Sequence, residues 1–215
     1  MNDSNIWNEI YSKTDYSPGW SKPGPDRNII EIVKNILRNY SKKDLSVLDV
    51  GCGNGRNSLI FDDISKPVIH YSGIDFSDTA IEYCKKKYAK EKIFIKQNIA
   101  EPIRSSLKSF DLVIDCGCFH SILPEKRKIY IENIINITKK NTIYILGAWF
   151  KKDSNLDIIT PRYFPYFSID EWLFNQKDIS ALFAPYFTLK SKKIDKTIYP
   201  DINDGFIYFV LSRND

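Results

Sequence analysis

The residues best suited to chemistry are three glycines at alternating positions, Gly51, Gly53 and Gly55, with Asp49 two residues before them. The apolar run that ends at Val50 predicts a strand that delivers the chain into a tight turn. Glycine lets the backbone turn sharply and lets a ligand approach without a Cβ in the way. A helix after the turn would offer free backbone N–H groups. The pattern therefore predicts a ligand site at this turn.

The spacing of the glycines distinguishes two classes of ligand. Dinucleotide sites use G-x-G-x-x-G and hold the pyrophosphate at the helix N-terminus. Here the spacing is G-x-G-x-G, and the carboxylate of Asp49 would repel a pyrophosphate. A ligand with a positive amino group suits this acid better. The turn therefore favours an amino-acid-bearing nucleoside over a nicotinamide dinucleotide.

A second acid, Asp75, ends the next predicted strand about 20 residues after the turn, where Rossmann-type folds place an acid against ribose hydroxyls. Both hydroxyls can donate to one carboxylate, and such charge-assisted hydrogen bonds are strong. The neighbouring Phe76 is placed to cover one face of an adenine ring. The alternative is that Asp75 caps the helix that begins near Ser77.

A third group of reactive side chains is the segment Cys116-Gly117-Cys118-Phe119-His120. Two thiols and an imidazole suggest a metal site, but no second Cys/His pair follows, so we expect packed thiols and no metal. Histidine changes its charge near neutral pH, so His120 could accept a proton from a substrate. It could equally fix its loop by a hydrogen bond, and both interpretations stay open. Tyr130, in the next predicted helix, is a second catalytic candidate.

The elements that must position these residues alternate between apolar strands and amphipathic helices. Strands are predicted at 46–50, 71–74, 92–96, 110–115 and 142–148, and helices at 29–38, 77–90 and 125–138. This order predicts a parallel sheet with helices on both faces. The last two strands, 186–190 and 206–211, are too close for a crossover and predict a hairpin-like antiparallel pair.

Composition limits the function classes. The 215 residues fit one domain, and 43% hydrophobic with 27% charged residues is typical of a soluble globular protein. The net charge of +4 is too mild to indicate a nucleic-acid partner. The polar N-terminus is not a signal peptide, and the longest apolar stretch is far short of the ~18 residues of a membrane span. We expect a cytoplasmic protein, monomeric or homodimeric.

Three segments resemble motifs of class I S-adenosylmethionine-dependent methyltransferases: Val47–Gly55, Gly73-Ile74-Asp75 and Phe110–Asp115. The run Gly51–Ser58 is especially similar to tellurite-resistance-type enzymes. The segment Trp7–Tyr11, with Pro18-Gly19-Trp20 after it, resembles the N-terminal cover of thiopurine and thiol methyltransferases.

The resemblance implies a Rossmann-like, doubly wound α/β fold with seven strands, of which the last is antiparallel, and S-adenosylmethionine as the methyl donor. It implies that the glycine turn and Asp49 hold the methionine end and that Asp75 holds the ribose. Asn98 stands where the family often has an aspartate that faces adenine, and its amide oxygen can accept the same bond. The implied cofactor-binding residues are Trp20, Asp49, Gly51, Cys52, Gly53, Asn54, Gly55, Asp75, Phe76, Asn98, Ile99, Asp115 and Cys116.

The expected reaction is in-line transfer of a methyl group to a small-molecule acceptor. We expect an N-terminal lid over residues 1–28 and an aromatic, substrate-side insert over residues 151–178. The alternative is that the aromatic residues of these segments only pack in the core or within the insert. The candidate acceptor contacts are Tyr11, Trp20, Phe119, His120 and Tyr163. The alternatives are a protein or RNA methyltransferase, a nucleotide-binding oxidoreductase and a non-catalytic cofactor-binding protein, because the fold alone does not separate them.

Overall fold

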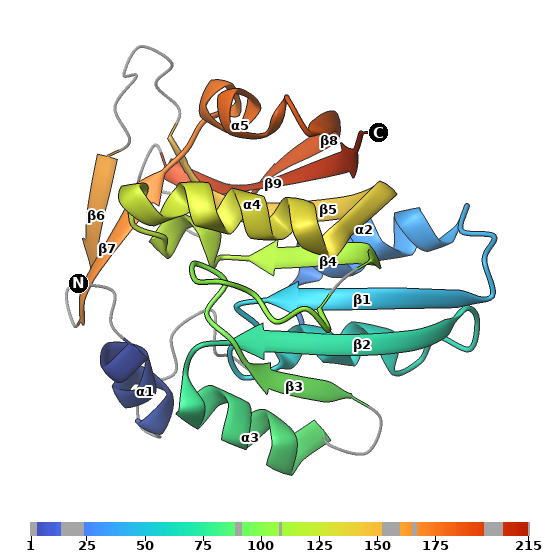
Figure 1. Cartoon of the computed structure of the whole chain (residues 1–215), viewed down its shortest axis with the longest axis horizontal. Helices are drawn as coiled ribbons and strands as arrows, with labels where there is room; N and C mark the ends of the chain where they lie inside the picture. The colour runs from blue at the N-terminus through green and yellow to red at the C-terminus, as the bar shows by residue number, and fades with distance from the viewer. Residues whose placement is uncertain are drawn as a thin grey trace.

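The computed structural model describes residues 4–13, 24–88, 92–107, 109–151, 160–164, 167–195 and 204–214. Their main feature is a seven-stranded sheet in the order β3-β2-β1-β4-β5-β9-β8 (Figure 1). Its strands are β1 Asp44–Val50, β2 Val68–Asp75, β3 Ile93–Lys96, β4 Phe110–Cys116, β5 Thr138–Lys151, β8 Phe187–Asp195 and β9 Asp204–Arg213.

The sheet has the predicted doubly wound topology. β1 lies between β2 and β4 and is parallel to both, whereas β9 is antiparallel to β5 and to β8. The expected antiparallel last strand and the expected terminal pair are therefore confirmed. Because the strand order reverses between β1 and β4, their carboxyl ends form the crevice where open α/β sheets bind ligands.

Helices cover both faces of the sheet and bury two separate cores. Strand residues alternate between faces, so Leu48 and Val50 lie in one core and Val47 in the other. The first core takes the apolar sides of α4 Arg127–Ile137 and α5 Gln176–Phe183. The second takes those of α2 Arg27–Leu37 and α3 Asp78–Tyr88. The remaining helical segments are α1 Ser4–Ser12, η2 Arg56–Phe61, η3 Phe119–Ser121 and η4 Pro124–Lys126.

Several elements start elsewhere than the sequence predicts. The helix expected from residue 125 begins as the 3₁₀ turn η4, with Pro124 at its first position, and becomes α-helical at Arg127. β5 starts at Thr138, directly after α4, and is longer than the apolar run 142–148. Ser77 caps α3 as expected, because its hydroxyl accepts a hydrogen bond from the Ala80 N–H at 3.1 Å.

Two further segments lie at the carboxyl edge of the parallel strands (Figure 1). One is α1, where Asn8 Oδ1 accepts a hydrogen bond from the Ser77 hydroxyl at 2.7 Å. The other is the two-stranded sheet of β6 Thr160–Phe164 and β7 Phe167–Leu173. Ile10 of α1 and Ile169 of β7 are buried together. Among the described residues, no helix is long and apolar enough to cross a membrane.

Candidate active site

The glycine turn after β1 presents bare backbone to the crevice. Gly51 and Gly53 have φ of 65° and 53°, a left-handed conformation that favours glycine. A Cβ added at Gly51 would lie 2.5 Å from Cys118 Cβ, and one added at Gly53 would lie 2.4 Å from Tyr11 Oη. The turn therefore requires glycine both for its backbone conformation and for the close approach of neighbours.

Asp75 joins the end of β2 to this turn. Its Oδ2 accepts a hydrogen bond from the Gly53 N–H at 2.9 Å, and its Oδ1 accepts one from the Ser77 N–H at 2.9 Å. Burial raises the pKa of Asp75, and these backbone hydrogen bonds oppose the rise. The carboxylate lies on the cavity wall beside the exposed backbone of the turn, so its remaining lone pairs suit ligand hydroxyls.

Two other aspartates at the strand ends lie behind the wall. Asp49 is buried, accepts a hydrogen bond from the Tyr71 hydroxyl at 2.7 Å, and has its pKa raised by burial to about 7. Asp115 accepts hydrogen bonds from the N–H groups of Cys118 and Phe119 at 2.8 Å and 3.0 Å. Burial raises the pKa of Asp115 to about 6. Neither carboxyl group lines the cavity: Asp49 binds Tyr71 of the neighbouring strand β2, and Asp115 holds the loop that follows β4.

Tyr130 and Phe119 lie in the core, away from the cavity. The Tyr130 hydroxyl donates to Asp115 at 2.5 Å and lies 2.6 Å from the Tyr144 hydroxyl. Phe119 is fully buried against Tyr130, with ring centroids 4.9 Å apart. These positions differ from the expected ligand contacts because the hydroxyl of Tyr130 points inward to a buried carboxyl group.

His120 is held by both ring nitrogens. Its Nδ1 accepts a hydrogen bond from the Trp149 backbone N–H at 3.3 Å, and its Nε2 lies 3.3 Å from Glu171 Oε1. The Trp149 indole N–H donates to Glu171 Oε2 at 2.5 Å. The three side chains come from η3, β5 and β7, and each lines the cavity. This geometry favours a positioning role for His120 over that of a free base.

The thiols near the cavity are neutral. Burial raises the pKa of the Cys116 thiol and that of the Cys118 thiol well above the usual value for cysteine. The pKa of Cys52 is also raised well above its usual value, by a hydrogen bond with Cys84 and by burial. A neutral thiol is a poor nucleophile and metal ligand. Among the described residues, no three His, Cys, Asp or Glu side chains gather in a way that could hold a metal ion.

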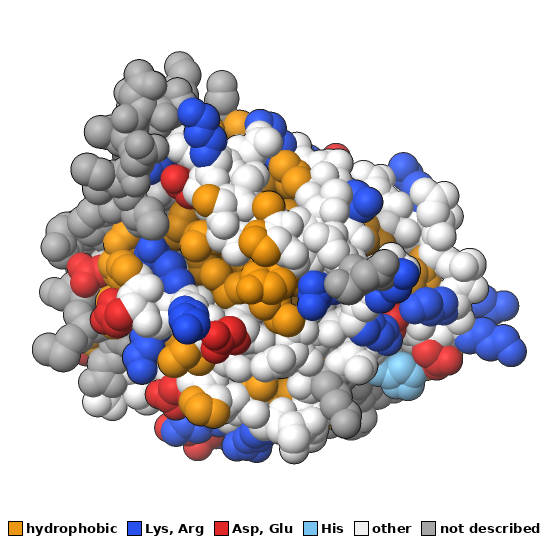
Figure 2. All heavy atoms as spheres, turned by 45° about the horizontal axis from the view of Figure 1, so that its top comes forward, with side chains coloured by type: hydrophobic (Ala, Val, Ile, Leu, Met, Phe, Trp, Pro, Cys, Tyr) orange, Lys and Arg blue, Asp and Glu red, His pale blue; other side chains and the backbone are white. Residues whose placement is uncertain are grey.

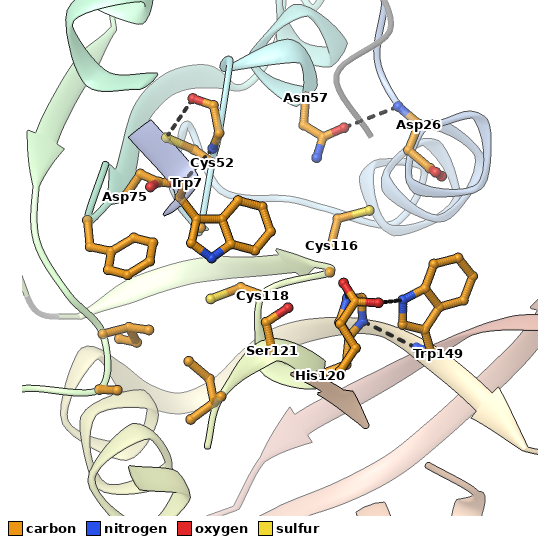
Figure 3. A pocket seen from close by; sticks show the side chains of 18 of the residues that line it. Trp7, Asp26, Cys52, Asn57, Asp75, Cys116, Cys118, His120, Ser121 and Trp149 are labelled. Atoms are coloured by element: carbon orange, nitrogen blue, oxygen red, sulfur yellow. Dashed lines mark hydrogen bonds and ion pairs between the residues drawn. The ribbon is translucent and has the colours of Figure 1, made fainter. Parts of the chain in front are cut away.

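One cavity of about 950 Å³ connects these groups. In Figure 3, Trp7, Cys52 and Asp75 lie at one side, His120 and Trp149 at the other, and Cys118 between them. A volume at the upper end of the roughly 300–1,000 Å³ typical of small-molecule sites leaves room for a nucleoside and a second small ligand.

The cavity brings together most of the predicted residues. Phe76 and Ile99 line it near Asp75, as does Asn98, whose Oδ1 accepts a hydrogen bond from the Ala100 N–H at 2.9 Å. The predicted residues on its wall are Tyr11, Gly51, Cys52, Gly53, Asp75, Phe76, Asn98, Ile99, Cys116 and His120. Those that do not line it are Asp49, Asn54, Gly55, Asp115, Phe119 and Tyr130. Trp20 and the side chain of Tyr163 lie outside the described part of the chain.

Sequence reasoning missed several polar residues on the wall. Glu171 lies two positions after the buried Ile169 on β7, so the two-residue period of a strand places both side chains on the same, inner face. Asp195 of β8 accepts hydrogen bonds from Arg27 at 2.9 Å and from the Asn28 amide at 2.7 Å. Asp26, before α2, accepts one from the Tyr208 hydroxyl at 2.9 Å. No local motif predicted these last pairings, which join residues more than 150 positions apart.

Comparison with known proteins agrees with this geometry. The profile of a protein family described as "Methyltransferase domain" matches residues 41–160. An uncharacterized methyltransferase of Schizosaccharomyces pombe is 34% identical over 117 residues, which cover 54% of this chain and 78% of the relative. The 2-heptyl-1-hydroxyquinolin-4(1H)-one methyltransferase of Mycobacteroides abscessus is 26% identical over 67% of this chain and 62% of its own.

A solved structure shares the fold across almost the whole chain. It is the 1,6-didemethyltoxoflavin-N1-methyltransferase of Burkholderia thailandensis, with its substrate and S-adenosylhomocysteine bound. The TM-score is 0.73 at 17% identity, and the match covers 99% of this chain and 88% of the other.

Proposed function

Since the chain belongs to the methyltransferase domain family and is a class I, S-adenosylmethionine-dependent methyltransferase, we propose that its methyl acceptor is a small molecule. The observation that carries the proposal is the single cavity that runs from the glycine turn to the buried cluster of His120, Trp149 and Glu171. Its far end is walled by aromatic side chains and a few polar groups, among them the carboxylate of Glu171, as small-molecule sites commonly are.

The residues of the near end fit the methyl donor. We propose that the bare backbone of Gly51 and Gly53 lies against its methionine part and that Asp75 binds the ribose hydroxyls. Phe76 and Ile99 offer apolar surface to the adenine, and Asn98 offers an amide to its amino group. S-adenosylmethionine supplies a methyl group on a positively charged sulfonium, and the sulfur leaves as a neutral thioether.

The far end would bind the acceptor and align it for in-line displacement. Phe206 packs edge-to-face on Trp149 and on His120, with ring centroids 5.2 Å and 5.8 Å away. Such a wall suits a flat or apolar molecule. Holding donor and acceptor in contact supplies much of the acceleration of a displacement, so little covalent help from the protein is required. Two of the proteins named above methylate heterocycles, a hydroxyquinolinone and a didemethyltoxoflavin, and flat rings of this kind suit such a wall.

Surface charge supports the small-molecule proposal over RNA. Figure 2 shows Lys and Arg side chains dispersed among Asp and Glu side chains, and on this face they do not form a continuous basic groove. RNA methyltransferases need such positive surface to neutralise phosphates.

A transfer assay with isotope-labelled S-adenosylmethionine tests the proposal. The purified protein is incubated separately with a panel of phenols, amines, thiols, halides and metalloid oxyanions, with total RNA, and with denatured and native protein extract. We expect label in at least one small molecule. Label found in RNA or protein but in none of the small molecules would contradict the proposal.

A further inference from the structure

Glu171 is a carboxylate buried at the far end of the cavity. Its side chain is 3% exposed, yet it contributes to the cavity wall. Two donors reach it, the His120 Nε2 and the Trp149 indole N–H. A carboxylate offers about four lone-pair positions, and the described side chains fill two of them, which leaves two for a ligand.

The hydrogen-bond network assigns the proton on His120. Nδ1 accepts from the Trp149 backbone N–H, so the neutral ring carries its proton on Nε2 and directs it to Glu171. In the part of the chain that the structure describes, His120 therefore presents no free lone pair to the cavity. Of these two side chains, Glu171 is therefore the one that can accept a hydrogen bond from a ligand, and His120 orients it.

Among the side chains that the structure describes, little positive charge compensates the carboxylate of Glu171. Its one ion-pair partner among the described residues is the imidazole of His120, which is charged only when protonated. Arg27, another residue of the cavity wall, pairs with Asp195 at 2.9 Å. An anion that entered beside Glu171 would meet like charge in a site with little water to screen it.

We infer that Glu171 selects the acceptor: it binds an N–H or O–H group of a neutral or cationic molecule and excludes anions. This inference rests on the proposed function, because it takes the far end of the cavity as the acceptor's place. It narrows the acceptor class to amines, ring N–H compounds, alcohols and phenols, and it removes halides, carboxylates and metalloid oxyanions.

The test compares three ligands that share one ring and differ in head group: benzylamine, benzyl alcohol and benzoate. Binding to the wild-type protein saturated with S-adenosylhomocysteine is measured by calorimetry. We expect benzylamine and benzyl alcohol to bind roughly tenfold or more tightly than benzoate, as the loss of a hydrogen bond to a charged group implies. This comparison needs no variant. Benzoate binding as tightly as benzylamine, or binding by none of the three ligands, would overturn the inference.

The variant Glu171→Gln keeps the shape of the side chain and removes its charge. We expect it to weaken benzylamine roughly tenfold and to leave benzoate unweakened, so that discrimination collapses. Binding of S-adenosylhomocysteine shows that the variant is folded. The matched control is Glu132→Gln, on the exposed side of α4, where discrimination should be unchanged. Full discrimination retained by a folded Glu171→Gln protein would contradict the role of Glu171.

Failure of the proposed function would look different. It would appear in the transfer assay as label in RNA or protein, whereas the head-group comparison measures binding and needs no turnover. Label on a small-molecule anion, such as iodide or tellurite, would leave the proposed function standing and reject the selection by Glu171.

Discussion

The Asp75 carboxylate accepts a hydrogen bond from the Gly53 backbone N–H at 2.9 Å, although the two residues are 22 positions apart in the chain. The parallel register explains the contact, because Val50 lies opposite Ile74 and both strands end at the same edge. The contact places the acid of β2 beside the bare backbone of the turn after β1. One ligand can therefore touch both, which is what a nucleoside with an amino-acid tail requires.

Asp49 should make the stability of the free protein fall with rising pH. Its folded pKa of about 7 lies above the ordinary value of roughly 4, so the folded state holds a proton that the unfolded state releases. The stabilisation is complete below about pH 4 and is lost as the pH rises through 7. Between pH 5 and pH 8, we expect the free energy of unfolding to fall by about 2–3 kcal/mol more in the wild type than in Asp49→Asn.

Urea unfolding of both proteins at the two pH values measures this difference. The raised pKa of Asp115, about 6, also makes stability fall as the pH rises. Because both proteins contain Asp115, this loss cancels in the comparison. The exposed Asp63→Asn serves as the control and should behave as the wild type. Equal losses in the wild type and Asp49→Asn would show that Asp49 is ionised in the fold at neutral pH.

Gly51→Ala should both strain the backbone and crowd Cys118. A side chain at φ 65° costs roughly 1–2 kcal/mol, and the new Cβ meets Cys118 Cβ at 2.5 Å. We expect a lower free energy of unfolding and weaker S-adenosylmethionine binding. Gly24→Ala is the matched control, since Gly24 has φ 87° but open space around it.

A second substitution separates the two causes. Cys118→Gly, combined with Gly51→Ala, relieves the crowding and leaves the backbone strain, so we expect partial recovery of stability in thermal melts. No recovery would assign the whole effect to the backbone.

Tyr130→Phe should affect stability more than catalysis. The substitution removes the donor to the buried Asp115, which costs about 1–3 kcal/mol. Because Tyr130 does not touch the cavity, kcat should stay within a few-fold of the wild type. Tyr40→Phe, which removes a partly exposed hydroxyl, is the control for stability. A large loss of kcat in a folded Tyr130→Phe protein would instead give Tyr130 a part in the reaction.

The fold was predictable because its signals are local. Apolar runs such as 46–50 mark strands, and the stripe of Ile29, Ile32 and Val33 marks a helix face that is buried as expected. The glycine turn follows β1 and Asp75 ends β2. Because these two strands are parallel neighbours, both groups lie at the same edge of the sheet. The boundaries of β5 and α4 were less predictable, because the pairing of Thr138 with Phe110 of β4 starts β5 early and pairing with β9 extends it to Lys151.

The far end of the cavity could not be predicted in the same way. Glu171 meets His120 and Trp149 only because β7 lies against the end of the sheet, and no local spacing encodes that contact. Tyr130 is expected at the pocket because it opens the helix after β4, but its position on that helix turns its hydroxyl toward Asp115. In both residues, the direction of the side chain depends on tertiary packing rather than on a motif.

The most direct test of the central claim is calorimetric titration of the wild type, Asp75→Asn and the exposed control Asp78→Asn with S-adenosylmethionine. We expect Asp75→Asn to weaken binding roughly tenfold or more and Asp78→Asn to leave it unchanged. With adenosine and 2′,3′-dideoxyadenosine as ligands, the effect of Asp75→Asn should appear only for the ligand that has the hydroxyls. Binding of S-adenosylmethionine by Asp75→Asn as tightly as by the wild type would show that the β2 carboxylate does not hold the ribose.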